Sequence, residues 1–322
     1  MNKKSLQSIL FIVFMMTGVL GYCDCGSVPF YSPLLLPLYP VKMIGDMMDR
    51  TRISYDPLKV RVFEPAQRAI ILWNGEEEIL LLSTDQKSTE KSAILEVIPL
   101  PSEPKVRLGS LETFEAVHRL IVQKRMWACA HGGARAELIQ APQQAGRITF
   151  NERLGPHDIS VAQVLSGDRF VEFVQSYLQE KYQTPEAPIR PEFVQIIQSY
   201  IDKGFRWFSF DVITLDESIK TREPIEYRFA SDRVFYPLKI STLEQGSTRV
   251  DLVVFTPKQS ASFQELESHR VSQEPQVDVA PEEVDLLDKS WKDFFNRSPQ
   301  IVMNQWKIEG NSSDLTKDVV VK

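Results

Sequence analysis

Alternating apolar and polar positions predict strands in the first third of the chain. Residues 68–83, RAIILWNGEEEILLLS, contain two β-rich runs on either side of Asn74-Gly75. Asn-Gly tolerates the positive φ angles of a two-residue hairpin, so the two runs are expected to pair. Residues 92–101, SAILEVIPLP, predict a further strand that ends at its prolines.

Three amphipathic helices are predicted next. Ser110 is a suitable N-cap for the helix after it, in which apolar residues from Leu111 to Ile121 recur at helical spacing. Residues 168–182 carry apolar side chains along one face. Residues 191–204 begin with proline and end with glycine, the order that a helix prefers.

The second half of the chain returns to strand patterns. Ile225 and Tyr227 face one side of their segment, whereas Glu226 between them faces the other, as in an antiparallel sheet with one wet face. The predicted fold class is therefore α+β, with antiparallel sheets and several amphipathic helices packed on them. The strands predicted here are 205–214, 225–229, 234–241 and 249–255.

The same patterns predict how the chain is divided. Residues 1–21 form a signal peptide, and residues 22–256 form an α+β domain. Residues 257–281 are polar and rich in Ser, Gln and Glu, which predicts a mobile loop. Residues 282–322 supply a C-terminal helix and strands that complete the domain.

The first residues predict export. A short basic start precedes an uncharged apolar run at residues 9–20, which is short for a membrane span of about 20 residues but fits a signal core. Val19 and Gly21 are small enough for signal peptidase, so cleavage is expected before Tyr22. The mature protein would then be periplasmic or extracellular, without a membrane span. An uncleaved N-terminal anchor is the alternative.

The charge pattern argues against nucleic acid and against anionic membrane surfaces as partners. The net charge is −6 and the isoelectric point about 5.5, with both signs interspersed along the chain. No basic stripe for nucleic acid and no polybasic membrane patch is present in the sequence. The expected partner is an envelope component or a ligand that the sequence does not identify.

The three cysteines predict a disulfide. In an oxidising compartment disulfides persist, and Cys23 and Cys25 are too close to pair with each other without strain. Cys129 is therefore expected to pair with one of them. The alternative is a tetrahedral site for zinc or a softer metal ion, built from Cys23, Cys25, Cys129 and His131. That alternative takes Cys129 and His131 to lie two apart on an extended strand, where both side chains point the same way.

Two other features bear on binding or catalysis. Phe205 and Trp207 would share one sheet face, where aromatic rings stack on sugars or other flat ligands. Both faces of that strand are apolar, however, which favours a central strand covered on each side. His157 is followed by Asp158, which could orient the imidazole for general-base work, but neighbours in sequence usually point in different directions.

Four blocks of the sequence together resemble the bacterial family catalogued as domain of unknown function 2330. Their shared features are a proline-bounded strand, a Leu-Gly-Pro turn before a helix, a Ser-Asp-x-x-x-x-Pro-Leu strand and a closing Asp-Leu-Thr. The resemblance implies export with a cysteine-containing mature start, and it carries over no catalytic residues. The blocks are 94–117, 152–182, 223–241 and 306–321.

The sequence lacks the usual signatures of catalysis. It contains no G-x-S-x-G elbow, P-loop, dinucleotide fingerprint or H-E-x-x-H motif. The favoured hypothesis is an exported, non-enzymatic binding or envelope-associated module without a cofactor. The alternative is an envelope hydrolase or redox enzyme in which Cys129 is the nucleophile and His131 the base, or a metal-binding protein.

Overall fold

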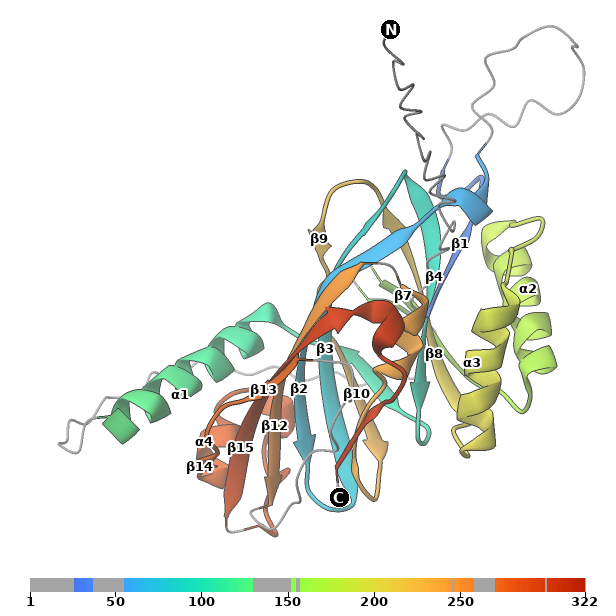
Figure 1. The fold of residues 1–322 in the computed structure, drawn as a ribbon. Coiled ribbons are helices and arrows are strands. Elements are labelled where there is room, and N and C mark those ends of the chain that lie inside the picture. Colours follow the sequence, from blue (N-terminus) through green and yellow to red (C-terminus); the bar gives the residue numbers. More distant parts are fainter. Residues whose placement is uncertain are drawn as a thin grey trace, which may run out of the picture.

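The computed structural model describes residues 26–36, 55–129, 152–154, 157–244, 246–257, 270–298 and 300–321. Two β-sheets dominate these residues (Figure 1). In the smaller sheet each strand is antiparallel to its neighbours. Its strands, in spatial order, are β1 (Ser27–Phe30), β4 (Ser92–Leu100), β8 (Trp207–Leu215), β7 (His157–Gln163) and β6 (Glu152–Leu154).

In the described part of the chain, the larger sheet has nine strands. Seven of them follow one path: β13 (Arg270–Gln273), β15 (Ile301–Asn311), β12 (Ser247–Pro257), β2 (Val62–Trp73), β3 (Glu77–Ser88), β10 (Ile225–Ala230) and β5 (Lys105–Leu108). Off this path, β14 (Val277–Val279) pairs with β15, and β9 (Lys220–Thr221) pairs with β3. The β12–β2 pair is parallel, so the predicted antiparallel pairing is wrong there. A separate antiparallel pair joins β11 (Val234–Tyr236) to β16 (Val319–Val321).

The helices cover the outer faces of the sheets (Figure 1). Phe208 and Phe210 of β8 pack against Phe170 of α2 and Phe193 of α3 in one buried cluster. On the larger sheet, Ile70 of β2 packs with residues of α1 and α4 in another. The helices are α1 (Leu111–Cys129), α2 (Gly167–Tyr182), α3 (Pro191–Asp202) and α4 (Pro281–Asp285).

The inner faces of the two sheets meet each other. Ile159 and Leu100 of the smaller sheet share a buried apolar cluster with Tyr227 and Leu252 of the larger one. The described residues therefore form four layers, helix–sheet–sheet–helix, and the predicted α+β class is confirmed. Within the described ranges, no helix is both long enough and apolar enough to cross a membrane.

The predicted hairpin is confirmed at Asn74-Gly75. The Asn74 N–H donates to the Glu77 carbonyl at 3.2 Å, and the Asn74 side chain accepts from the Glu76 and Glu77 N–H groups. Gly75 has a φ of +102°, in the region that disfavours side chains. The turn fixes the register of β2 against β3, two central strands of the larger sheet.

Four predictions of local structure are corrected. The expected loop at 257–281 contains β13 and β14, because β15 offers both of them an edge for pairing. The C-terminal helix expected within residues 282–322 is short: α4 ends at Asp285 and is followed by a 3₁₀ turn at Lys289–Trp291. The strand expected at 234–241 ends at Tyr236, before Pro237 and a 3₁₀ turn at Lys239–Leu243. Glu226 is buried rather than wet, since Trp291 and Arg107 cover it and donate to its carboxylate.

Candidate functional site

The two faces of strand β8 lie in different environments. Phe208 and Phe210 point toward α2 and α3. Successive side chains of a strand alternate between its faces, so Ser209 and Asp211 point the other way, into the space between the sheets. Both polar residues are buried there. The alternation that buries the phenyl rings thus places a carboxylate in the interior.

His157, the first residue of β7, lies next to Asp211. Its Nδ1 contacts the Asp211 carboxylate and also lies 2.8 Å from Arg222 Nη2. Arg222 Nη2 donates to the same Asp211 oxygen at 3.2 Å. The other Asp211 oxygen accepts from the Asp158 backbone N–H at 2.9 Å. Three ionisable side chains from different parts of the chain therefore form one buried group.

Both ring nitrogens of His157 are occupied by protein groups. Nε2 lies 3.0 Å from the Glu223 carbonyl oxygen, which can only accept, so Nε2 carries a hydrogen. Nδ1 faces Asp211 and Arg222. The imidazole in this arrangement orients its neighbours and has no nitrogen left to take a proton from a substrate.

Arg222 keeps part of its guanidinium available. It follows β9 and is 9% exposed, and a single nitrogen, Nη2, makes its contacts with His157 and Asp211. Its remaining N–H groups have no side-chain or backbone partner among the residues the structure describes, and Arg222 lines a cavity. An arginine carries five N–H donors, so donor capacity remains beside that cavity.

A second polar group lies across the cavity. Gln67 Nε2 donates to Glu64 at 2.7 Å and to the Ser241 hydroxyl at 3.0 Å, and the Tyr236 hydroxyl donates to Gln67 Oε1. The Glu244 carboxyl is a further acidic group that acts on Glu64. Burial raises the pKa of Glu64 to about 8, so Glu64 is protonated at neutral pH.

Glu96 of β4 lies between the two groups. Gln86 donates a hydrogen bond to its carboxyl. Burial raises the pKa of Glu96, and Asp211 adds to this effect while Arg222 opposes it. The carboxyl groups around the cavity therefore carry less negative charge than their number suggests.

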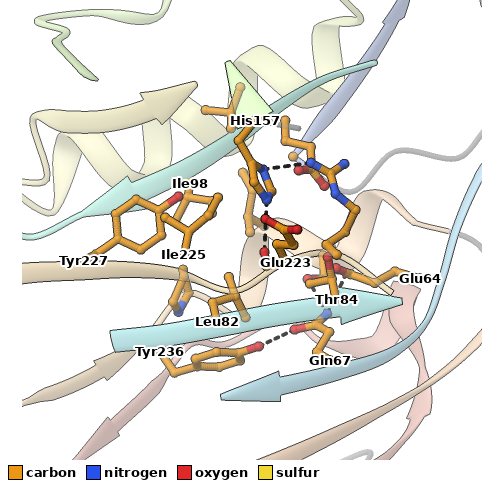
Figure 2. Close-up of a pocket in the computed structure, with 17 residues that line it drawn as sticks. Glu64, Gln67, Leu82, Thr84, Ile98, His157, Glu223, Ile225, Tyr227 and Tyr236 are labelled. Atoms are coloured by element: carbon orange, nitrogen blue, oxygen red, sulfur yellow. Dashed lines mark hydrogen bonds between the residues drawn. The ribbon is translucent and has the colours of Figure 1, made fainter. Parts of the chain in front are cut away.

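The cavity itself is small. Figure 2 shows His157 at one end and Tyr236 with Gln67 at the other, with Leu82 and Ile225 between them. Its volume of about 60 Å³ is room for roughly four water molecules at about 10–15 Å³ each. Its other lining residues are Gly26, Glu64, Thr84, Glu96, Val97, Ile98, Arg222, Glu223, Tyr227, Pro237, Ile240 and Ser241.

A larger groove lies on the outside of the molecule. It measures about 690 Å³ and runs between α1 and the outer face of the larger sheet, with Phe114, Val117 and Ile121 on its helical wall. Charged residues of its sheet wall pair with each other, as Arg249 and Asp251 do at 2.8 Å. These pairs are partly exposed, in contrast to the group around Asp211.

The buried polar groups make the inner cavity the candidate site. Removing charged groups from water is costly, and apolar residues of similar volume often give equal or greater stability. Ionisable groups with perturbed pKa values that gather in a cavity are typical of functional sites. Glu64 and Glu96 meet that description, and Arg222 brings unused donors to the same cavity.

The cysteine predictions concern residues that the structure does not place. Cys23, Cys25 and His131 lie outside the described residues, so the disulfide and the zinc alternative both stay predictions. Cys129 is the last residue of α1, and its side chain is outside the description. The extended strand assumed at Cys129 is wrong, because the helix from Ser110 continues that far. Among the residues described, no group of three or more His, Cys, Asp and Glu side chains could hold a metal ion.

The aromatic pair predicted for ligand stacking is divided between two clusters. Phe205 precedes β8 and packs against Tyr200 and Phe235, with ring centroids 5.7 and 4.7 Å away. Trp207 packs on the apolar cluster between the sheets. The two rings form no common platform, and β8 is a central strand with cover on both faces.

The sequence offered little warning of the site. Asp211 was the one acidic residue in the aromatic run 205–214, and that was its only signal. Glu64 and Glu96 stand in strands where an acidic residue usually faces solvent. Arg222 lies in a polar stretch with no recognisable motif.

Comparison with known proteins gives a family and no activity. The family model described as "Uncharacterized protein conserved in bacteria (DUF2330)" matches residues 58–310, a range that contains every cavity residue named above except Gly26. No curated protein matches the chain.

Two solved structures show a weak likeness to the chain. A crystal structure of baculovirus P35 is 10% identical, with a TM-score of 0.36, over 83% of this chain and 98% of that one. The caspase-8/P35 complex is 9% identical, with a TM-score of 0.30, over 80% and 96%. Likeness at this level carries no argument about fold or function.

Proposed function

The chain belongs to DUF2330, the bacterial family that its sequence resembles, and we propose that it is an exported binding module that holds a small polar ligand in the cavity between its sheets. The basic start and the short apolar run at residues 9–20 support export. The cavity supports binding.

One observation carries the binding proposal. Arg222, at 9% exposure, is held by His157 and Asp211 through a single nitrogen, and its other N–H groups have no described partner beside the cavity. A guanidinium that a carboxylate holds in place, but whose other N–H donors remain unpaired, is preorganised to bind a polar ligand. Water or a ligand is left to meet the remaining donors.

The geometry favours binding over hydrolysis. A general base needs a nitrogen or oxygen within reach of the proton that it removes. Both nitrogens of His157 are already engaged by Asp211, Arg222 and the Glu223 carbonyl. The imidazole therefore supports a role in holding Arg222 and Asp211 in place.

The size of the cavity limits the affinity. Small ligands gain at best about 1.5 kcal/mol per non-hydrogen atom, so a guest of about four such atoms binds no tighter than tens of micromolar. Binding should therefore be sought with millimolar ligand, by ligand-observed NMR and by the rise in unfolding temperature.

The test uses the mature wild-type protein and a panel of small probes: acetate, formate, urea and methylammonium. At least one probe is expected to bind the wild type and to lose binding in Arg222→Met. Arg228→Met is the matched control, because Arg228 lies on β10 and pairs with Glu77 away from the cavity. Absence of binding by all four probes would contradict the proposal.

Export has its own test. Intact-mass analysis of protein recovered from the native host is expected to give a chain that begins at Tyr22. Recovery of the full-length chain, held in membranes, would show that the apolar run is an anchor.

A further inference from the structure

The lining of the cavity is richer in hydrogen-bond donors than its acidic residues suggest. Arg222 has N–H groups to spare. Tyr227, which lines the cavity, accepts from the Ser209 hydroxyl at 3.4 Å, and its own O–H has no acceptor within the described part of the chain. The guanidinium of Arg222 and the hydroxyl of Tyr227 thus provide two kinds of donor in residues that line the inner cavity.

The nearby carboxyl groups do not cancel this donor character. Glu64 is surrounded by Glu244, Tyr236, Gln67, Glu96 and Asp85, and burial raises its pKa to about 8. At neutral pH it is therefore a neutral acid.

Burial also disfavours the charged form of Glu96. It faces Gln86, Arg222, Asp211 and His157, and burial raises its pKa although Arg222 opposes the shift. Asp211 already offsets one positive charge in this group. A guest with its own negative charge is therefore not opposed by an ionised Glu64 at neutral pH, and the burial of Glu96 weakens any repulsion from that side.

We infer that the ligand of the cavity is a small monocarboxylate of about the size of acetate, held by the free edge of the Arg222 guanidinium. A planar carboxylate accepts two parallel N–H bonds from one guanidinium, which a compact cation or a neutral amide does not. The Tyr227 hydroxyl supplies a further donor. This inference rests on the proposed binding function and gives it a ligand class.

The rest of the cavity fits the remainder of such a molecule. Leu82, Ile98 and Ile225 form its apolar wall, which suits a methyl group. A volume of about 60 Å³ admits a few non-hydrogen atoms and excludes a longer chain. The cavity should therefore discriminate carboxylates by length.

The opposite ligand class would have the opposite pH dependence. A small cation such as methylammonium would be favoured by an ionised Glu64, so its affinity would rise with pH. A carboxylate is repelled once Glu64 carries a negative charge, so its affinity should fall as Glu64 ionises near pH 8. The sign of the pH dependence separates the two classes.

The experiment is a calorimetric titration of the mature protein with acetate and with methylammonium from about pH 6 to about pH 9. Acetate is expected to bind, with an affinity that falls by up to about tenfold per pH unit above pH 8 and with proton uptake on binding. Sodium chloride controls for ionic strength. Tighter binding of methylammonium with rising pH would overturn the carboxylate inference and leave the binding function standing. If neither acetate nor methylammonium binds, the carboxylate inference is overturned. If formate and urea do not bind either, the proposed binding function is contradicted as well.

Variants and a length series complete the test. Arg222→Lys keeps the charge but loses the planar fork, so acetate should bind more than about tenfold more weakly. Arg228→Lys is the control and should bind acetate as the wild type does. If Arg222→Lys fails to fold, the length series decides with the wild type alone: formate and acetate are expected to bind, and butyrate is not. Equal binding of acetate and butyrate would overturn the inference.

Discussion

The inner cavity and the outer groove differ in size and in charge environment. The outer groove beside α1 measures about 690 Å³, and its Arg249–Asp251 pair has side chains 50% and 34% exposed. The inner cavity measures about 60 Å³, and the His157–Asp211 pair beside it has side chains 2% and 3% exposed. The smaller hollow has the more unusual chemistry.

The difference shows that solvent access, rather than residue type, decides what a charged pair does. An exposed pair such as Arg249–Asp251 is screened by water and salt and contributes about 0–1 kcal/mol. The charges around Asp211 lie where screening is weak, so each depends on its partners. Volume alone would have selected the groove as the site.

The largest contrast is expected from matched substitutions in the two hollows. Asp211→Asn leaves Arg222 buried without its carboxylate, so the free energy of unfolding should fall by about 3–5 kcal/mol. Asp251→Asn breaks an exposed pair and should cost less than about 1 kcal/mol. Urea unfolding measures both. Equal losses would show that the two environments do not differ as described.

A pH dependence should follow from Glu64. Its pKa is about 8 in the folded protein, against 4.5 for an unperturbed glutamic acid, so the folded state holds a proton that the unfolded chain releases. Stability from this residue is full below about pH 4.5 and falls by about 1.4 kcal/mol per unit up to about pH 8. Between about pH 6 and about pH 7.5 the wild type should lose about 2 kcal/mol that Glu64→Gln does not lose. Parallel pH profiles would contradict this prediction.

A smaller effect is expected from the hydroxyl of Tyr236. Tyr236→Phe removes the donor to Gln67 and leaves a buried amide oxygen without that partner, which should cost about 1–2 kcal/mol. Its counterpart in the groove is Arg125→Met, which removes exposed contacts to Gln305 and Glu274 and should cost about 0.5 kcal/mol or less. Thermal unfolding of both variants measures the difference, and a larger loss for Arg125→Met would reverse the comparison.

Much of the local structure was predictable because its causes are local. The hairpin at Asn74-Gly75, the N-cap at Ser110 and the helix after Pro191 depend on residues within one or two turns of each other. The errors came where a distant element intervened. Trp291 covers Glu226, which is expected from the sequence to face solvent. Strands β13 and β14 pair with β15, although their segment is too polar to be predicted as strand.

The candidate site could not be predicted from local patterns, because distant elements form it. In sequence, Glu64 and Glu96 are ordinary acidic residues of strands. Only the packing of one sheet on the other removes them from water and raises their pKa values. Arg222 gains its role because β9 brings it to β3, beside strands that come from other parts of the chain.

The contacts of His157 show which features the sequence determined and which depended on tertiary structure. The sequence determined that His157 has a carboxylate beside it, Asp158, and that neighbours on a strand point to opposite faces. Asp158 accordingly turns away and binds Lys181 and Tyr182 of α2. The carboxylate that meets the imidazole is Asp211, 54 residues further on. Strand pairing of β7 with β8 brings it there, and register between distant strands depends on packing that no local pattern encodes.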